Sequence, residues 1–418
     1  MKLPLLCLLF ALLTTPPLYG AEPLTLDEAL RISLKNHPQM VEARENLLGA
    51  EARTGQAVAH YYPQVSIVAD WSKGRSFLTA PEETKETEVY TGALYLKQTI
   101  YDFGRTSGAV DAARFNREAA DKTLELTRQE LSLRVKSAYY LLLATEKQVV
   151  ATKETLKARE AVYTQAAEFF KQGIRAKVDA VKAEANFFAA KTILIRAENN
   201  RAIARIELAN AMGMRSLDNR SLIEPPAVTE PLPEKPQVTY ALHNRGELLQ
   251  LAALKSAATA NLRTSKSSFL PLLSGTAHVG YADKSLPPAG NVWGIGLNLT
   301  IPLFSGFSSV QQVREATAAL NAVSARHDNL NLQIIKEVET AWLNVNEASA
   351  RMVSTDMEVA SANENQVLTE GRYHEGVGNI IEVTDAQSLA LDAQTAHIQA
   401  VYDYYIALAR LDRAIGQE

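Results

Sequence analysis

Two long segments without helix-breaking residues set the strongest limit on how this chain can fold. Residues 105–170 contain no proline and one glycine, near the start of the segment. Residues 308–372 likewise contain no proline and one glycine, at the end. At the helical rise, each segment would form a helix on the order of 100 Å long. Helices of this length gain most of their stability from packing along an apolar face, so the sequence predicts a bundle of long helices.

The sequence also contains an internal repeat. Thr99–Arg105 matches Pro302–Ser308 at an offset of 203 residues. Alanines recur every seven residues at Ala183, Ala190, Ala197, Ala204 and Ala211, and again 203 residues later at Ala386, Ala393, Ala400, Ala407 and Ala414. Sustained heptads are typical of coiled coils, in which small residues let helices approach closely. We infer a duplication.

Nearer the N-terminus the offset between the two halves changes. Asn36–Gln39 matches Asn244–Glu247 at an offset of 208 residues. The five-residue difference falls between residues 63 and 101, which indicates a surface loop of different length in the two halves.

The duplication suggests a division of the chain. A charged start, a short apolar run and a small-residue end predict a signal peptide over residues 1–21. The first repeat covers residues 22–224, a proline-rich connector residues 225–237, and the second repeat residues 238–418. Since the only cysteine, Cys7, lies in the expected signal peptide, the mature chain has no disulfide.

Each half contains two stretches of alternating polarity followed by the long helix and a shorter one. The alternation predicts strands at about 64–73, 89–99, 272–281 and 291–301. The alanine heptads predict return helices at 178–213 and 380–416. About ten residues is the length of a transmembrane β-strand. Four strands cannot close a barrel, and lipid does not tolerate an open sheet edge. If these strands cross a membrane, several chains must share one barrel.

Composition excludes several other classes of protein. The formal net charge of −4 gives no support for nucleic-acid binding. The seven histidines are scattered without metal-ligand spacing, and no acid–base or nucleophile cluster is present. We therefore expect no enzyme, no cofactor and no metal site. Beyond the signal peptide, no apolar stretch reaches the length of a membrane helix.

Four segments carry a family resemblance, in chain order Thr99–Arg105, Gly173–Asp179, Ile301–Gly306 and Gly376–Asp385. With the doubled helix–strand–strand–helix–helix order, the mature chain resembles the TolC family of outer-membrane efflux proteins. The resemblance implies a mainly α fold with a small transmembrane β portion: a TolC-like α-barrel plus β-barrel. Four strands from each chain of a trimer would make a twelve-stranded barrel, below which long coiled-coil helices form a tunnel.

The resemblance also implies a function and partners. The chain would be a subunit of an outer-membrane channel-tunnel for efflux or type I secretion, with its helices in the periplasm. It would form a homotrimer in outer-membrane lipid. A periplasmic adaptor (membrane fusion) protein and an inner-membrane pump or ABC exporter would deliver the cargo, which the sequence does not identify. The alternative is a periplasmic coiled-coil adaptor, which predicts one long hairpin rather than two equivalent ones.

In the family, tip residues line the periplasmic entrance, and the matching positions here are Asp179, Tyr373, Glu382 and Asp385. Carboxylates gathered in a ring raise one another's pKa and attract cations, so Glu382 and Asp385 would bind blocking divalent cations. The competing interpretation is that these acids complement helix N-termini.

One position of the tip departs from the family pattern. Gly378 stands where the family has a basic residue, and Arg175 or Lys177 is a candidate substitute.

Overall fold

The computed structural model describes residues 23–79, 82–217, 220–226 and 234–417. The expected signal peptide and the middle of the expected connector lie outside these residues. The elements of the first half are α1 (Leu26–Asn36), α2 (Pro38–Ala59), β1 (Gln64–Thr79), β2 (Glu82–Tyr101), α3 (Arg105–Lys171) and α4 (Lys177–Ala211). Those of the second half are α5 (Val238–Asn244), α6 (Gly246–Ser267), β3 (Leu272–Asp283), β4 (Gly290–Thr300), α7 (Ser308–His374) and α8 (Ile380–Ile415).

The described chain divides into two compact units. One combines residues 135–231 and 357–402 with the N-terminal residues up to 33, and the other combines residues 34–134, 232–356 and those from 403 onward. Each unit therefore takes segments from both halves of the duplicated sequence, because each long helix contributes residues to both units. Among the described helices, none combines the length and the apolarity needed to cross a membrane.

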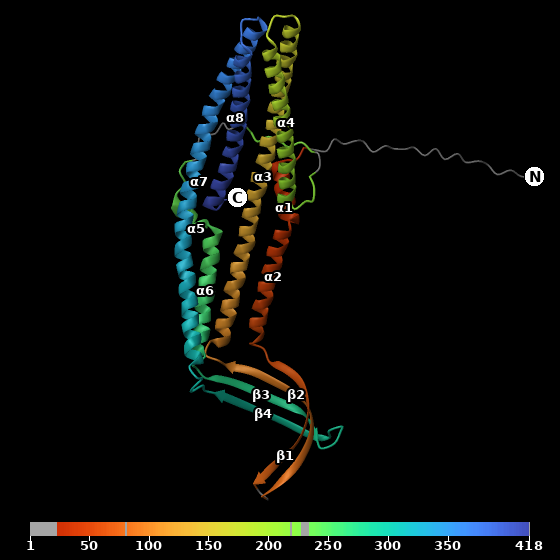
Figure 1. The fold of residues 1–418 in the computed structure, drawn as a ribbon. Helices are drawn as coiled ribbons and strands as arrows, with labels where there is room; N and C mark the ends of the chain where they lie inside the picture. The colour runs from red at the N-terminus through yellow and green to blue at the C-terminus, as the bar shows by residue number, and fades with distance from the viewer. Residues whose placement is uncertain (1–22, 80–81, 218–219, 227–233, 418) are drawn as a thin grey trace, which may run out of the picture. The chain divides into compact units, whose positions relative to one another are not determined.

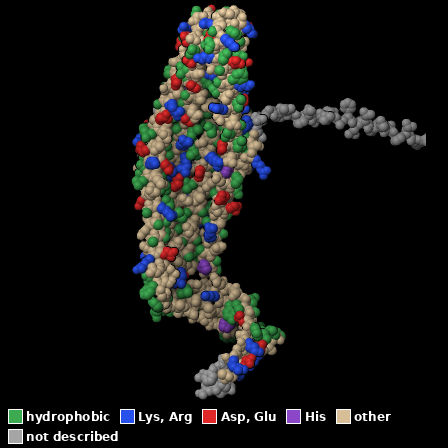
Figure 2. Space-filling model, in the orientation of Figure 1, with side chains coloured by type: hydrophobic (Ala, Val, Ile, Leu, Met, Phe, Trp, Pro, Cys, Tyr) green, Lys and Arg blue, Asp and Glu red, His purple; other side chains and the backbone are tan. Residues whose placement is uncertain are grey.

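The two long helices each contain 67 residues, and the return helices 35 and 36 (Figure 1). All ten heptad alanines that defined the duplication are buried. Small side chains at these positions let neighbouring helices approach closely, which is how such long helices bury surface along their length. On the face shown in Figure 2, basic and acidic side chains are interspersed over the helices.

The four strands form one antiparallel sheet in the order β1-β2-β3-β4, and they bend along their length (Figure 1). In β4 the exposed apolar side chains Trp293, Ile295, Leu297 and Leu299 alternate with glycine and polar residues. This alternation gives the strand one apolar face and one face of small or polar side chains. In the described part of the chain, β1 and β4 have no further strand beside them.

The first hairpin is longer than the alternation in the sequence indicated. β1 reaches Thr79 rather than residue 73, and β2 begins at Glu82 rather than residue 89. Charge pairs lie where the added part begins: Lys73, the last residue of the expected strand, lies 3.2 Å from Glu88, and Arg75 lies 3.8 Å from Glu86. Opposite charges across a strand pair stabilise the ladder without an apolar face, so the polarity of this stretch concealed a strand.

In the unit that contains residues 135–231, two extended segments lie on α3. Leu24 pairs in parallel with Leu222. The hydroxyl of Tyr139, a fully buried residue of α3, lies 2.8 Å from the carbonyl oxygens of both Leu24 and Ile223 and accepts from the N–H of Ile223. The side chain thus provides hydrogen-bond partners for backbone groups that lie outside the described strands.

Candidate functional site: the helical tip

Two short turns join the long helices to the return helices. Gly173 and Gly376 follow α3 and α7 with φ of 74° and 78°, in the left-handed region that favours glycine. The N–H of Ile174 donates to the Phe169 carbonyl at 2.9 Å, and that of Val377 donates to the Arg372 carbonyl at 3.1 Å. This is the bond pattern of a Schellman motif. The two turns are therefore the same structure at an offset of 203 residues.

The return helices begin with acidic residues in their first turns. Asp179 lies in the first turn of α4 and Glu382 in that of α8. Asn379 caps α8, since its side-chain oxygen accepts from the N–H of Ile381 at 2.9 Å. Negative charge in the first turn is favoured by the helix dipole, so this local role is available to both acids whatever else they do.

The structure places the four predicted entrance residues in different surroundings. Glu382 and Asp385 are exposed, and Asp179 is half-buried. Tyr373 is only 1% exposed and belongs to an apolar cluster that also contains Val162, Ala166, Ala183, Ile380 and Val383. In a single chain Tyr373 is therefore a core residue of the tip.

The hydroxyl of Tyr373 is buried and forms no hydrogen bond with any described residue. Burial raises the pKa of Tyr373, and the negative charge of Asp179 raises it further, whereas the Arg175 guanidinium opposes the shift. That guanidinium lies 5.9 Å from the centre of the tyrosine ring, within cation–π range. The structure thus brings Asp179, Tyr373 and Arg175 together.

The exposed acids of α8 interact little with their surroundings. Glu382 lies 3.8 Å from Arg372, and both side chains are exposed, so this ion pair contributes little. Asp385 forms no ion pair within the described residues, and no described hydrogen bond or ion pair joins Asp179 to Glu382. Both acids of α8 are therefore accessible to ions in solution.

Arg175, one of the two candidate substitutes named from the sequence, contacts the turn that contains Gly378. Its Nη2 donates to the carbonyl oxygen of Gly376 at 2.6 Å and to that of Gly378 at 2.8 Å. The guanidinium of the first turn thus holds the backbone of the second turn. The sequence repeat relates the two residues of this contact, because Arg175 and Gly378 are equivalent positions.

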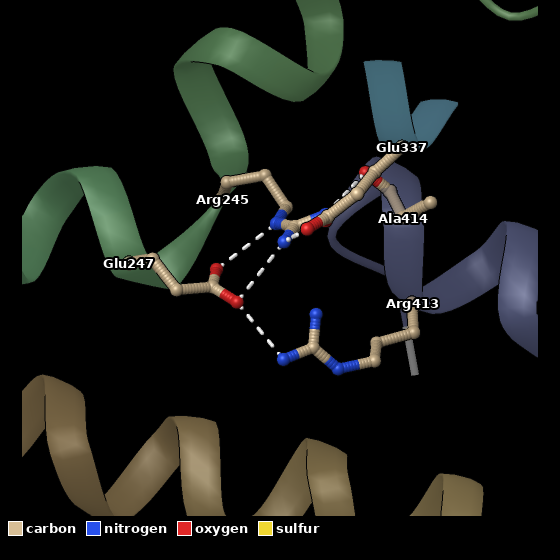
Figure 3. Close-up of polar contacts among 5 residues, drawn as sticks. All are labelled: Arg245, Glu247, Glu337, Arg413 and Ala414. Atoms are coloured by element: carbon tan, nitrogen blue, oxygen red, sulfur yellow. Dashed lines mark hydrogen bonds and ion pairs between the residues drawn. The ribbon is translucent and has the colours of Figure 1, made fainter. Parts of the chain in front are cut away.

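Sequence reasoning missed a second charged cluster, away from the tip (Figure 3). Arg245, 2% exposed at its side chain, precedes α6 and donates to both carboxylate oxygens of Glu247, at 2.9 and 3.1 Å. It also donates to Glu337 of α7 at 2.7 Å and to the Ala414 carbonyl of α8 at 2.9 Å. Arg413 adds a bond to Glu247 at 2.9 Å. One guanidinium therefore ties α6 to α7 and to the end of α8.

In this cluster, burial and the ion-pair partners shift the pKa values of Arg245 and Glu247 in opposite directions. Burial would lower the pKa of Arg245, but the hydrogen bonds and charges of Glu247 and Glu337 raise it above its usual value. Burial would likewise raise the pKa of Glu247, and the bonds and charge of Arg245, with the charge of Arg413, lower it. Both groups are thus held in their charged forms.

Comparison with known proteins identifies the family. The family of outer membrane efflux proteins matches residues 29–214 and 238–417, which together make up most of the chain and leave out the connector. The chain belongs to the outer membrane efflux protein family. The protein is accordingly located in the outer membrane, and it functions as a channel for efflux or type I secretion.

Individual relatives of this efflux protein agree with that assignment. The outer membrane protein TolC of Vibrio cholerae is 26% identical, over 94% of this chain and 90% of its own length. The alkaline protease secretion protein AprF of Pseudomonas aeruginosa is 24% identical, over 93% of this chain and 83% of its own length. The solved structure of the channel OprN has a TM-score of 0.86 at 20% identity, covering 94% of this chain and 90% of that chain, which shows the shared fold.

These findings also bear on the alternatives drawn from the sequence. The expected TolC-like fold class, with four strands in each chain, is confirmed. The relatives are channels rather than enzymes, and they give no support to a periplasmic adaptor. In the described part of the chain, no group of three or more potential ligand residues could hold a metal ion.

Proposed function

We propose that three copies of this efflux protein close one channel, which conducts cargo passively across the outer membrane. The sheet supports this proposal most directly. Its exposed apolar side chains suit lipid, yet within the described residues β1 and β4 have open edges. Backbone groups at an open edge have no partner in lipid, so further copies must supply the neighbouring strands. Three copies would give twelve strands.

The helical tip is the proposed periplasmic entrance, with Asp179, Tyr373, Glu382 and Asp385 as its gate residues. Glu382 and Asp385 lie three residues apart on one face of α8 and are both exposed. A trimer would bring three such pairs around one axis. The resulting ring of carboxylates favours cations and would bind divalent ions that block the current.

Cargo would reach the entrance from a periplasmic adaptor and an inner-membrane pump or ABC exporter. Membership of the efflux family supports this arrangement, as does the similarity to a protein whose name assigns it to protease secretion. Selection of the cargo would then occur in the pump that delivers it.

Reconstitution tests the proposal. The protein purified in detergent should have the mass of a trimer, resist dissociation by SDS until heated, and form discrete conductance steps in planar lipid bilayers. A water-soluble monomer that needs no detergent and forms no channel would overturn the proposal.

A further inference from the structure

A pocket lies where the end of α8 meets the start of α6, between residues of the two long helices. Its volume is about 700 Å³, which is in the range of small-molecule sites. Leu133 of α3 lines it together with one side of α7, from Leu330 to Asn344. All lining residues belong to the compact unit that contains residues 34–134, 232–356 and those from 403 onward. The pocket is thus formed within one unit of a single chain.

One part of the lining is apolar. Leu133 and Leu330 contribute larger side chains, and both are half-buried. Ala341 of α7 and Ala407 and Ala414 of α8 are buried. Small side chains on neighbouring helices leave room beside the backbones, and an apolar group placed against them is removed from water. This part of the pocket therefore suits the hydrocarbon portion of a ligand.

The charged part of the lining is mainly basic. Four cationic side chains and two carboxylates contribute to it: Arg245, Lys336, Arg410, Arg413, Glu247 and Glu337. Arg245 and Arg413 bind Glu247, and Arg245 also binds Glu337 (Figure 3). Arg410 and Lys336 are exposed and form no hydrogen bond or ion pair with any described residue. Two cations thus remain available to a ligand after the carboxylates are paired.

The excess of positive charge belongs to the second half of the repeat alone. The first-half equivalents of Lys336, Arg410 and Arg413 are Leu133, Glu207 and Asn210. An apolar, an acidic and a neutral side chain therefore stand where the second half has three cations. Since both halves form the same helices without this charge in common, helix packing does not account for it.

The pocket opens on the side of α7 that faces away from the connector. Lys235 of the connector lies 2.8 Å from Glu339 and 5.3 Å from the centre of the Trp342 ring. Successive helical residues are rotated by about 100°. The pocket residues Glu337 and Thr340, each two positions earlier, therefore lie on nearly the opposite side. A connector inside the proposed tunnel would obstruct it, so the pocket side faces the interior.

We propose that this pocket binds amphiphilic anions, which have a carboxylate or sulfate headgroup and a compact apolar body, as they pass through the tunnel. The headgroup pairs with Arg410 and Lys336, and the apolar body lies against Leu133 and Ala407. A guanidinium and an ammonium group both form charge-assisted bonds to such headgroups, and burial of the apolar body adds to binding. The inference rests on the proposed trimer, which would hold three such sites around the middle of its helices.

Photolabelling can locate the bound anion. The probe is octanoate with a diazirine at the end of its chain, added to the purified protein in a nonionic detergent. Mass spectrometry identifies the labelled peptides. We expect labels within residues 330–344 and 407–414, and we expect excess unmodified octanoate to remove them. The same probe with an amine in place of the carboxylate is the charge control, and labelling of the detergent-exposed strands is the internal reference.

Charge variants test the two free cations. Arg410→Gln with Lys336→Gln should reduce labelling of the pocket roughly tenfold relative to the strands, because the headgroup loses both charged partners. The trimer should form normally, since neither side chain has a partner among the described residues. Arg326→Gln is the matched control, because Arg326 is exposed on α7 and lies outside the pocket. Arg410→Glu with Lys336→Glu should make the amine probe the preferred label.

Several results would overturn the assignment. They are pocket labelling that is equal in the unmodified protein and in the Arg410→Gln, Lys336→Gln variant, equal labelling of the pocket by the carboxylate and amine probes, and labels confined to the strands. A protein that labels in the pocket as expected but forms neither SDS-resistant trimers nor channels would instead contradict the proposed function, because the pocket is complete within one chain.

Discussion

Arg245 and Glu247, two residues apart at the start of α6, form a buried bidentate ion pair with nitrogen–oxygen distances of 2.9 and 3.1 Å. The guanidinium also reaches the Ala414 carbonyl at the end of α8. In the first half the equivalent carbonyl, that of Ala211, has a neutral partner. The hydroxyl of Ser33 donates to it at 2.7 Å, and Ala211 is the repeat equivalent of Ala414. Of these two contacts between described residues, the one in the second half uses a charge to hold the end of the return helix.

Removing that charge should destabilise the protein strongly. Arg245→Ala leaves Glu247 buried without its main partner, and breaking a buried pair in this way costs about 3–5 kcal/mol. Lys122→Ala is the control, because the pair between Lys122 and Glu125 is partly exposed and worth at most about 1 kcal/mol. Chemical denaturation in detergent, followed by circular dichroism, measures both. Equal effects of the two variants would show that the cluster carries no special stability.

The same cluster predicts a loss of stability in acid. The pKa of Glu247 is lower in the folded protein than in the unfolded chain, where it is about 4.3. A depressed carboxyl pKa contributes stability above the unfolded value, and that contribution is lost as the pH falls through the folded value. The denaturant concentration at the unfolding midpoint should therefore decrease once the pH is lowered below about 4. Glu247→Gln should be less stable at neutral pH and should show a smaller further drop. If Glu247→Gln had the same pH profile as the unmodified protein, the result would argue against the lowered pKa of Glu247.

At the tip, Glu382→Ala combined with Asp385→Ala should weaken block by divalent cations. Both side chains are exposed on one face of α8, and a trimer would lose six carboxylates. We expect the blocking concentration of Mg²⁺ to rise by about tenfold, because the ion loses nearby opposite charge. Glu358→Ala with Glu364→Ala is the control, since these acids are exposed on α7 away from the turn. Unchanged block in single-channel recordings would remove Glu382 and Asp385 from the gate.

Tyr139→Phe should loosen the extended segments at Leu24 and Ile223. The substitution keeps the ring but removes the hydroxyl that contacts two carbonyl oxygens and one N–H, at a cost of about 1–3 kcal/mol. Hydrogen exchange of the Ile223 amide should accelerate. Tyr163→Phe is the matched control, because the contact described for that ring is stacking on Phe187, which the variant retains. Equal exchange in both variants would mean that the hydroxyl holds neither segment.

The parts of the fold governed by local periodicity could be predicted from the sequence. The long helices run Arg105–Lys171 and Ser308–His374, against the expected 105–170 and 308–372. Their limits are set by residues close by in the chain, such as the left-handed glycines Gly173 and Gly376. The strand alternation at Trp293 to Leu299 is local in the same way.

Contacts between distant segments could not be predicted. Glu337 and Arg245 are 92 residues apart, and Arg413 and Glu247 are 166 apart. No local pattern pairs such residues. The burial of Tyr373 likewise depends on α3 and α8 closing over it.

The far end of the first hairpin is a ladder of opposite charges, with Lys73 between Glu86 and Glu88, at 3.4 and 3.2 Å, and Arg75 beside Glu86. These side chains are largely exposed, so dissolved ions reach them freely. The screening length falls from about 10 Å at 0.1 M ionic strength to about 3 Å at 1 M. This end of the hairpin is therefore stiffest in dilute media and frays as the surroundings become more saline, while the alternating apolar rungs nearer the helices keep their pairing.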